Sequence, residues 1–122
     1  MAATKLNLKI EQGATYIGPG SGGNATLKNG SPPVPTDLTA CTARMQVRRA
    51  VDDPEVLLSL TTENGGIVLG GTAGTITLGL TAVQTAAIQW TAGVYDLEMI
   101  YSTGLVRRLL AGTVTVSREV TR

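Results

Sequence analysis

The stretch from Gly93 to Ser117 reads GVYDLEMIYSTGLVRRLLAGTVTVS and predicts two strands joined by a tight turn at residues 102–104. On the first arm, apolar residues alternate with acidic ones, namely Tyr95, Leu97, Met99 and Tyr101 with Asp96 and Glu98. This period of two is typical of a strand with one buried face. We therefore expect the rest of the chain to be organised around an antiparallel hairpin.

The register of this hairpin is left open by the sequence. A two-residue loop keeps Val106, Leu110, Val114 and Val116 inside but also turns Arg108 inward. A three-residue loop pairs Glu98 with Arg108 and requires a bulge at Gly112 to return the valines to the core. Sequence alone permits both arrangements.

The same alternation predicts further strands at residues 5–11, 41–49, 55–61, 67–69 and 75–80, with short pieces at 14–17 and 24–28. Turns are expected at residues 29–30, 52–54 and 64–66, which are rich in Asn, Asp, Gly and Pro. The prolines at positions 32, 33 and 35 predict an extended connector. Turns this frequent favour an antiparallel sandwich of seven or eight strands, formed by one domain, residues 1–122.

One segment departs from the strand pattern. Thr81 and Gln84 have the spacing of a capping box, and Val83, Ala87 and Trp90 follow at helical intervals. We expect about two turns of helix here, ending before Gly93. Trp90, the only tryptophan, is expected to close one end of the core.

The composition points to a β-rich protein with an unusually neutral surface. Charged residues make up 16% of the chain, against an average of about 25%, and there are eighteen threonines and fifteen glycines. We expect part of this surface to be covered by neighbours; the alternative is a threonine-coated soluble domain. A net charge of +1 argues against nucleic acid or anionic lipid as a partner.

The sequence lacks the signals of export or membrane insertion. No run approaches the length of about 20 apolar residues that a span needs, and residues 1–12 alternate instead of forming a secretory apolar core. We therefore expect synthesis in the cytoplasm and no membrane partner. The single cysteine, Cys41, excludes an internal disulfide.

The glycine-rich segment from Gly18 to Gly23 satisfies the spacing G-x-G-x-x-G of nucleotide-binding loops. No helix is predicted after it, and Asn24 and Ala25 stand where a phosphate-binding loop needs Lys and Ser or Thr. We interpret the segment as a flexible hairpin tip whose role the sequence does not define.

Other candidate chemical groups are weak. Histidine is absent, so Cys41 lacks an imidazole to activate it and is interpreted as a buried apolar thiol. Asp52, Asp53 and Glu55 form the only acidic cluster; paired carboxylates could cleave a glycoside or bind Ca²⁺, but a solvated turn is favoured. We predict no enzyme activity, no catalytic, cofactor-binding or metal-binding residues, no cofactor and no small-molecule substrate.

Two arginine pairs, Arg48–Arg49 and Arg107–Arg108, lie within predicted strands. Neighbouring residues on a strand point to opposite faces, so a continuous basic stripe is not expected. We interpret the pairs as edge protection or ion pairing within the sheet; contact with an acidic partner is the functional alternative.

Several segments resemble small structural proteins of tailed bacteriophages: DLTACTARMQVRR (37–49), LLSLTTENGG (57–66), GTITLGLTAVQTAAI (74–88), GVYDLE (93–98) and RRLLAGTVTVSREVT (107–121). More distantly, their order is similar to that of the Ig-like N-terminal domain of phage baseplate upper proteins. The region 13–35 departs from this pattern because of its glycine-rich loop. The resemblance implies an Ig-like sandwich and supplies no catalytic residues.

From these features we expect a non-enzymatic virion component, assembled in the host cytoplasm, that adapts or anchors fibres in the tail, baseplate or neck. Its partners would be other copies of itself and other virion proteins. Capsid decoration is the first alternative. A carbohydrate-binding module is the second, and it needs an exposed aromatic platform, for which only Tyr16, Trp90, Tyr95 and Tyr101 are available.

Overall fold

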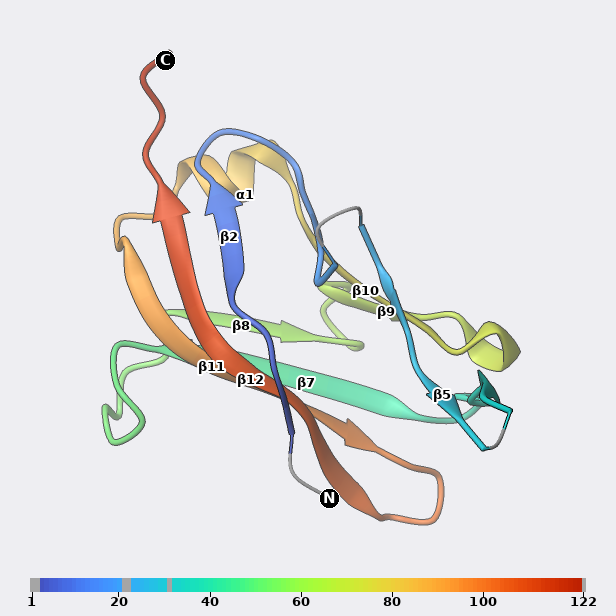
Figure 1. Cartoon of the computed structure of the whole chain (residues 1–122). Coiled ribbons are helices and arrows are strands. Elements are labelled where there is room, and N and C mark those ends of the chain that lie inside the picture. The colour runs from blue at the N-terminus through green and yellow to red at the C-terminus, as the bar shows by residue number, and fades with distance from the viewer. Residues whose placement is uncertain (1–2, 21–22, 31, 122) are drawn as a thin grey trace.

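The structure is a computed structural model that describes residues 3–20, 23–30 and 32–121 (Figure 1). Its elements are, in chain order, β1 Thr4–Lys5, β2 Leu8–Glu11, β3 Tyr16–Gly18, β4 Ala25–Thr26, β5 Lys28–Asn29, β6 Val34–Pro35, β7 Thr42–Arg48, β8 Leu58–Thr61, β9 Ile67–Leu69, a 3₁₀ turn Gly71–Ala73, β10 Thr75–Leu80, α1 Ala82–Ala86, β11 Ala92–Ile100 and β12 Val106–Ser117. Strands dominate, and the one short α-helix of the described residues precedes the penultimate long strand, as predicted.

Two sheets pack face to face. The first has the order β1-β12-β11-β7-β8, with β2 on the same edge of β12 as β1; in the second, β10 lies between β9 and the successive segments β3 and β4. Counting β1–β2 and β3–β4 as one run each, the two sheets contain eight strands among the described residues. This arrangement is that of an Ig-like sandwich, so the predicted fold class is confirmed. One detail differs: β1 and β2 pair with β12 in parallel.

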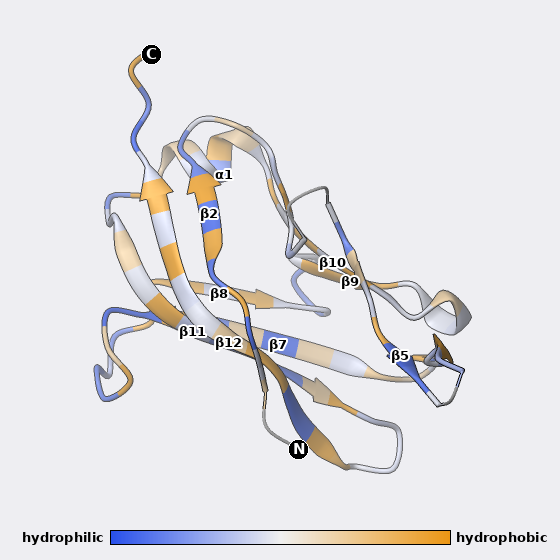
Figure 2. Cartoon of the chain, in the orientation of Figure 1, coloured by the Kyte–Doolittle hydropathy of each residue, from blue (hydrophilic) through white to orange (hydrophobic). Residues whose placement is uncertain are grey.

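The core lies between the sheets, where alternate residues of both sheets point inward. Figure 2 shows the resulting bands of apolar and polar residues along β2 and β12. Buried hydrophobic residues of the first sheet are Leu8, Ile10, Ala43, Met45, Val47, Leu60, Tyr95, Leu97, Met99, Val114 and Val116, and those of the second are Ile67, Ile76, Leu78 and Leu80. Leu38 and Ile88 close the core from connecting segments. The predicted inward faces of the central strands are therefore confirmed.

The β11–β12 hairpin adopts the three-residue loop of the two predicted arrangements. Glu98 pairs with Arg108, and the backbone N–H of Tyr101 donates to the carbonyl of Leu105 at 2.8 Å. The predicted bulge at Gly112 is wrong, because the register shifts between Leu97 and Glu98 and leaves Leu109 as the extra residue. This shift returns Val114 and Val116 to the core.

Gly112 has a different reason to be glycine. A Cβ there would lie 2.4 Å from the carbonyl oxygen of Leu6, in the short segment between β1 and β2. The same oxygen accepts a hydrogen bond of 2.6 Å from the hydroxyl of Tyr95. The glycine thus lets the N-terminal run approach β12 closely, and Tyr95 fixes it there.

The helix α1 is shorter than predicted. Its capping box is present, since Gln84 N donates to Thr81 Oγ1 at 3.1 Å and Thr81 N donates to Gln84 Oε1 at 2.8 Å. The apolar interval does not face the core, because Val83 is 80% exposed. Thr85 is buried instead, donating to the carbonyl of Ala14 at 2.8 Å. Polar bonding to the β2–β3 turn, and not apolar packing, holds this helix.

The predicted hairpin tip is confirmed only locally: Gly20 and Gly23 form an isolated antiparallel bridge, in which the N–H of Gly23 donates to the carbonyl of Gly20 at 3.0 Å. Its flanking strands β3 and β4 do not pair with each other; both pair with β10, through Gly18 with Leu78 and Ala25 with Ile76. Between these two contacts β10 advances by two residues, whereas the segment that pairs with it advances by seven, from Gly18 to Ala25. The five extra residues loop out of the strand, and the chain then rejoins it. Ser21 and Gly22 lie outside the described residues.

The proline cluster only partly forms the predicted connector. Pro32 and Pro33 lie in a turn, whereas Pro35 belongs to β6, which pairs with β5 in a small separate ladder. Gly30 adopts a φ of 89° at this turn, as the predicted Asn29-Gly30 signal implies.

Candidate functional site

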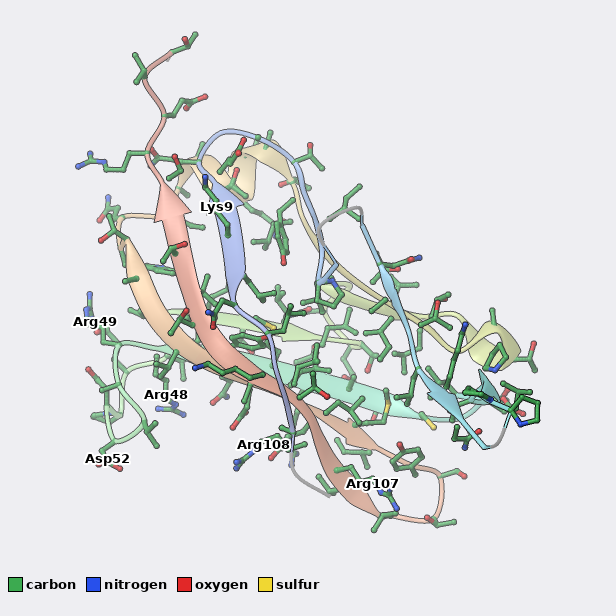
Figure 3. The ribbon with its side chains drawn as sticks, viewed as in Figure 1. Lys9, Arg48, Arg49, Asp52, Arg107 and Arg108 are labelled. Atoms are coloured by element: carbon green, nitrogen blue, oxygen red, sulfur yellow. The ribbon has the colours of Figure 1, made fainter. Side chains whose placement is uncertain are left out.

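Charged side chains of the first sheet form cross-strand pairs on its outer face. Arg44 Nε lies 2.8 Å from Glu98 Oε1, and Arg108 Nε lies 3.4 Å from Asp96 Oδ2. These groups are partly exposed, so each pair contributes no more than about 1 kcal/mol. Arg107 makes no ion pair within the described part of the chain and lies on the opposite side of the hairpin from Arg108 (Figure 3).

The acidic cluster is an exposed turn that binds arginine. Arg49 pairs with Glu55, and Arg48 donates to the backbone oxygen of Asp53 at 2.8 Å. The carboxylate of Asp53 accepts the N–H of Glu55 at 2.9 Å, which is turn chemistry. Figure 3 places Asp52 and this arginine pair at the β7–β8 loop, well away from the pair on the β11–β12 hairpin. Within the described residues, no three His, Cys, Asp or Glu side chains gather closely enough to hold a metal ion.

Cys41 lies just before β7 and is only partly buried, so the predicted buried thiol is wrong in degree. The turn before it is fixed by Asp37, whose Oδ1 accepts the N–H of Thr39 at 2.9 Å and its hydroxyl at 2.6 Å. These hydrogen bonds lower the pKa of the Asp37 carboxyl. The segment therefore has a structural explanation.

Two tyrosines lie close together inside the sandwich. Burial raises the pKa of Tyr16 to about 12. Burial, with a smaller contribution from the neighbouring Tyr16, raises the pKa of Tyr95 to about 12. Both phenols therefore remain protonated at neutral pH. Tyr95 belongs to the core, as predicted, and Tyr16 is partly buried against it, so neither offers an aromatic platform.

Trp90 borders a pocket of about 460 Å³ at the α1 end of the sandwich. Gln12 shapes this pocket: its Nε2 donates to the carbonyl of Ile88 at 2.9 Å, and its Oε1 accepts the N–H of Glu119 at 2.9 Å. The indole is only partly buried and packs against the core, so it closes one end of it as predicted. Arg118 supplies the one charged side chain among the residues that line the pocket.

The second sheet contrasts with the first in charge. Its strands β3, β4, β9 and β10 contain no Asp, Glu, Lys or Arg, whereas the strands of the first sheet contain nine such residues. On the outer face of the second sheet, Ile17 is 57% exposed and Val68 is 58% exposed. An uncharged face with exposed aliphatic side chains is a typical interaction surface. We call this the uncharged face.

The sequence shows that these strands lack charge, but it does not show that they are neighbours. Ile17, Val68 and Gly79 were therefore not predicted as site residues. The signal was present in the composition of residues 14–17, 67–69 and 75–80. The three segments form one surface because β3 and β9 both pair with β10 in the folded chain.

The β8 edge of the first sheet is partly covered by a side chain. Asn64, in the turn after β8, accepts the N–H of Thr61 at 2.9 Å and donates to the carbonyl of Ser59 at 3.0 Å. These are backbone groups that an edge strand would otherwise offer to another chain.

In the part of the chain that the structure describes, the helices do not have the length and apolar character needed to span a membrane.

Comparison with known proteins gives no sequence relative. No protein-family model matches the chain, and no curated protein matches it. Among solved structures it is similar to extracellular domains 3–5 of Drosophila OTK, with 16% identity and a TM-score of 0.35. The match covers 91% of this chain and 33% of that one, so this chain spans about a third of the length of its structural neighbour.

Proposed function

We propose that this protein is a structural component of a tailed-phage virion, located in the tail, baseplate or neck, where it adapts or anchors fibres through symmetric assembly. The observation that carries the proposal is the segregation of charge: nine charged residues in the strands of one sheet and none in those of the other. A free monomer gains nothing from an uncharged sheet face with exposed Ile17 and Val68.

The resemblance of residues 37–121 to phage structural proteins supports this assignment. A structural protein binds its neighbours through the shape and the buried area of its surfaces. Under this proposal, the charged sheet stays in water or contacts other virion proteins, while the uncharged face packs against a neighbour.

Antibody labelling of purified particles from the source, viewed by electron microscopy, tests the proposal. Label on the tail, baseplate or neck is expected. Label on the shell would favour capsid decoration instead. Particles that lack the protein by both labelling and mass spectrometry would refute a virion role.

The pocket beside Trp90 favours a second candidate function, carbohydrate binding. A partly exposed indole next to Arg118 offers a stacking surface and a charged donor, which is a combination suited to an acidic sugar. Because Trp90 is the only tryptophan, its fluorescence reports on this pocket alone. A saturable change on titration with host polysaccharide, weakened by Arg118→Gln, would support this function, and an unchanged spectrum would eliminate it.

A further inference from the structure

The chain contains two Asn-Gly dipeptides, Asn29–Gly30 and Asn64–Gly65. In this dipeptide the backbone nitrogen of the glycine can reach the side-chain amide of the asparagine, because glycine has no side chain in the way and a freely rotating backbone. Both asparagines are exposed, and both glycines have a positive φ, 89° and 81°. Sequence and exposure therefore make the two sites alike, and only their hydrogen bonds distinguish them.

The side-chain amide of Asn64 is held at both of its polar atoms. Its Oδ1 accepts the N–H of Thr61 at 2.9 Å and the N–H of Gly66 at 2.8 Å. Its Nδ2 donates to the carbonyl of Ser59 at 3.0 Å. Three hydrogen bonds to the backbone of β8 and of its own turn thus fix this amide in one orientation.

The side-chain amide of Asn29 forms no hydrogen bond within the described part of the chain. Asn29 ends β5, which pairs with β6 through two residues of each strand. One of these, Pro35, has no N–H to donate to the ladder. All four residues are exposed, and β5 lies at the rim of the molecule (Figure 1). Such a ladder opens locally at low cost, which leaves Asn29 free to react.

We propose that Asn29 is a site of spontaneous deamidation, and that the hydrogen bonds of Asn64 protect the second Asn-Gly dipeptide from the same reaction. The backbone nitrogen of Gly30 attacks the side-chain carbonyl carbon of Asn29 and forms a new C–N bond. The bond from that carbon to the amide nitrogen breaks, and this nitrogen leaves as ammonia with the proton that the backbone nitrogen has lost. Water then opens the resulting succinimide ring to aspartate or to isoaspartate, so that neither an oxidant nor a reductant is needed.

The same attack at Asn64 requires the amide to turn away from the three backbone groups that hold it. Each hydrogen bond that must break first slows the reaction by roughly five-fold, so the three together slow it by roughly 100-fold. One dipeptide is therefore reactive in the folded protein and the other is protected.

The products differ from the original chain in charge and in backbone length. Either acid adds a negative charge, which cancels the formal net charge of +1. Isoaspartate also routes the backbone through the former side chain, which adds a methylene group to β5 and disrupts its pairing with Val34. Because β5 and β6 bury no side chain, the modified protein should unfold at the same temperature as the original.

Peptide mapping by mass spectrometry, on purified protein stored in mildly alkaline buffer, tests the proposal. Deamidated Asn29 is expected to accumulate, with isoaspartate among its products, while Asn64 reacts roughly 100-fold more slowly. Storage in guanidinium chloride is the matched control, because unfolding breaks the hydrogen bonds of Asn64 and the two dipeptides should then react at similar rates. Asn29→Gln should keep its charge on storage, since the longer side chain must close a larger ring.

Three results would overturn the inference. The first is an Asn29 that keeps its amide in the folded protein, and the second is an equal rate at both sites in the folded protein. The third is a difference in rate that persists in guanidinium chloride, because it would assign the protection of Asn64 to the local sequence and not to its hydrogen bonds.

Discussion

Ala40 carries the chain through a left-handed backbone conformation, with a φ of 63°. The conformation is imposed by the turn that contains Ala40, in which the N–H of Cys41 donates to the carbonyl of Leu38 at 3.0 Å. A residue with a Cβ pays roughly 1–2 kcal/mol for this conformation. The turn therefore holds strain that glycine would relieve.

Ala40→Gly is expected to raise the free energy of unfolding by about 0.5–1 kcal/mol, since relief of the strain exceeds the added backbone entropy. Urea denaturation measures it. Ala92→Gly is the control: Ala92 is exposed in β11, and its φ is not positive, so the same change should lower stability. Equal loss in both variants would show that the turn at Ala40 is not strained.

The buried tyrosines predict a loss of stability in alkali. An unfolded tyrosine has a pKa of about 10, whereas burial raises the pKa of Tyr16 and Tyr95 to about 12 in the folded protein. Their contribution is therefore complete below pH 10 and is lost as the pH rises through 12. Urea midpoints measured between pH 8 and 12 should fall above pH 10.

The same series with phenylalanine variants assigns the effect. Tyr16→Phe and Tyr95→Phe should each make the alkaline decline less steep. At pH 7, Tyr95→Phe should also lose about 1 kcal/mol, because it leaves the carbonyl of Leu6 without its hydroxyl donor. A decline of unchanged slope in both variants would assign it to other groups.

Among the elements, the central strands follow from the sequence, because a period of two is a local property of each segment. The site of the bulge does not. Gly112 looks like a bulge residue when only β12 is considered. The absence of a side chain there instead makes room for the carbonyl of Leu6, more than 100 positions earlier in the chain. Similarly, the helical interval of Val83 suggests a buried face, while the contact that holds α1 is a threonine hydroxyl bonded to the β2–β3 turn.

Gly112→Ala is expected to lower the free energy of unfolding by about 1–3 kcal/mol, because the added methyl overlaps the carbonyl of Leu6. Hydrogen exchange at the amides of β2 should accelerate as this run separates from β12. Gly79→Ala, which meets no neighbour, provides the comparison and should cost nothing. A Gly112 variant as stable as wild type would mean that the approach of Leu6 is not tight.

We expect that the loop formed by residues 19–23, between β3 and β4, can be removed without unfolding the protein. Deleting residues 19–23 joins Gly18 to Asn24 and continues the pairing with β10 from Leu78 to Ile76 without a break. Shortening a loop lowers the entropy cost of closing it. The deletion variant should fold with an unchanged circular dichroism spectrum and an unfolding midpoint no lower than that of wild type. An unfolded product would show that the five residues help to hold the strand.

At the scale of the whole molecule, the important property is the difference between its two faces. The low charge of the chain is visible in its composition, but the concentration of charge in one sheet depends on which strands become neighbours. Strand pairing is non-local, so residues as distant as Ile17 and Gly79 meet only in the folded chain. The sandwich could be predicted, and the face could not.

The side chain of Asn64 matters most where many copies are crowded together. Strands that meet edge to edge can recruit further chains without limit, which is the route by which β proteins form amyloid. By occupying the outward backbone groups of Ser59 and Thr61, one amide blocks that recruitment along β8. Copies packed at high density are therefore less able to join through this one strand.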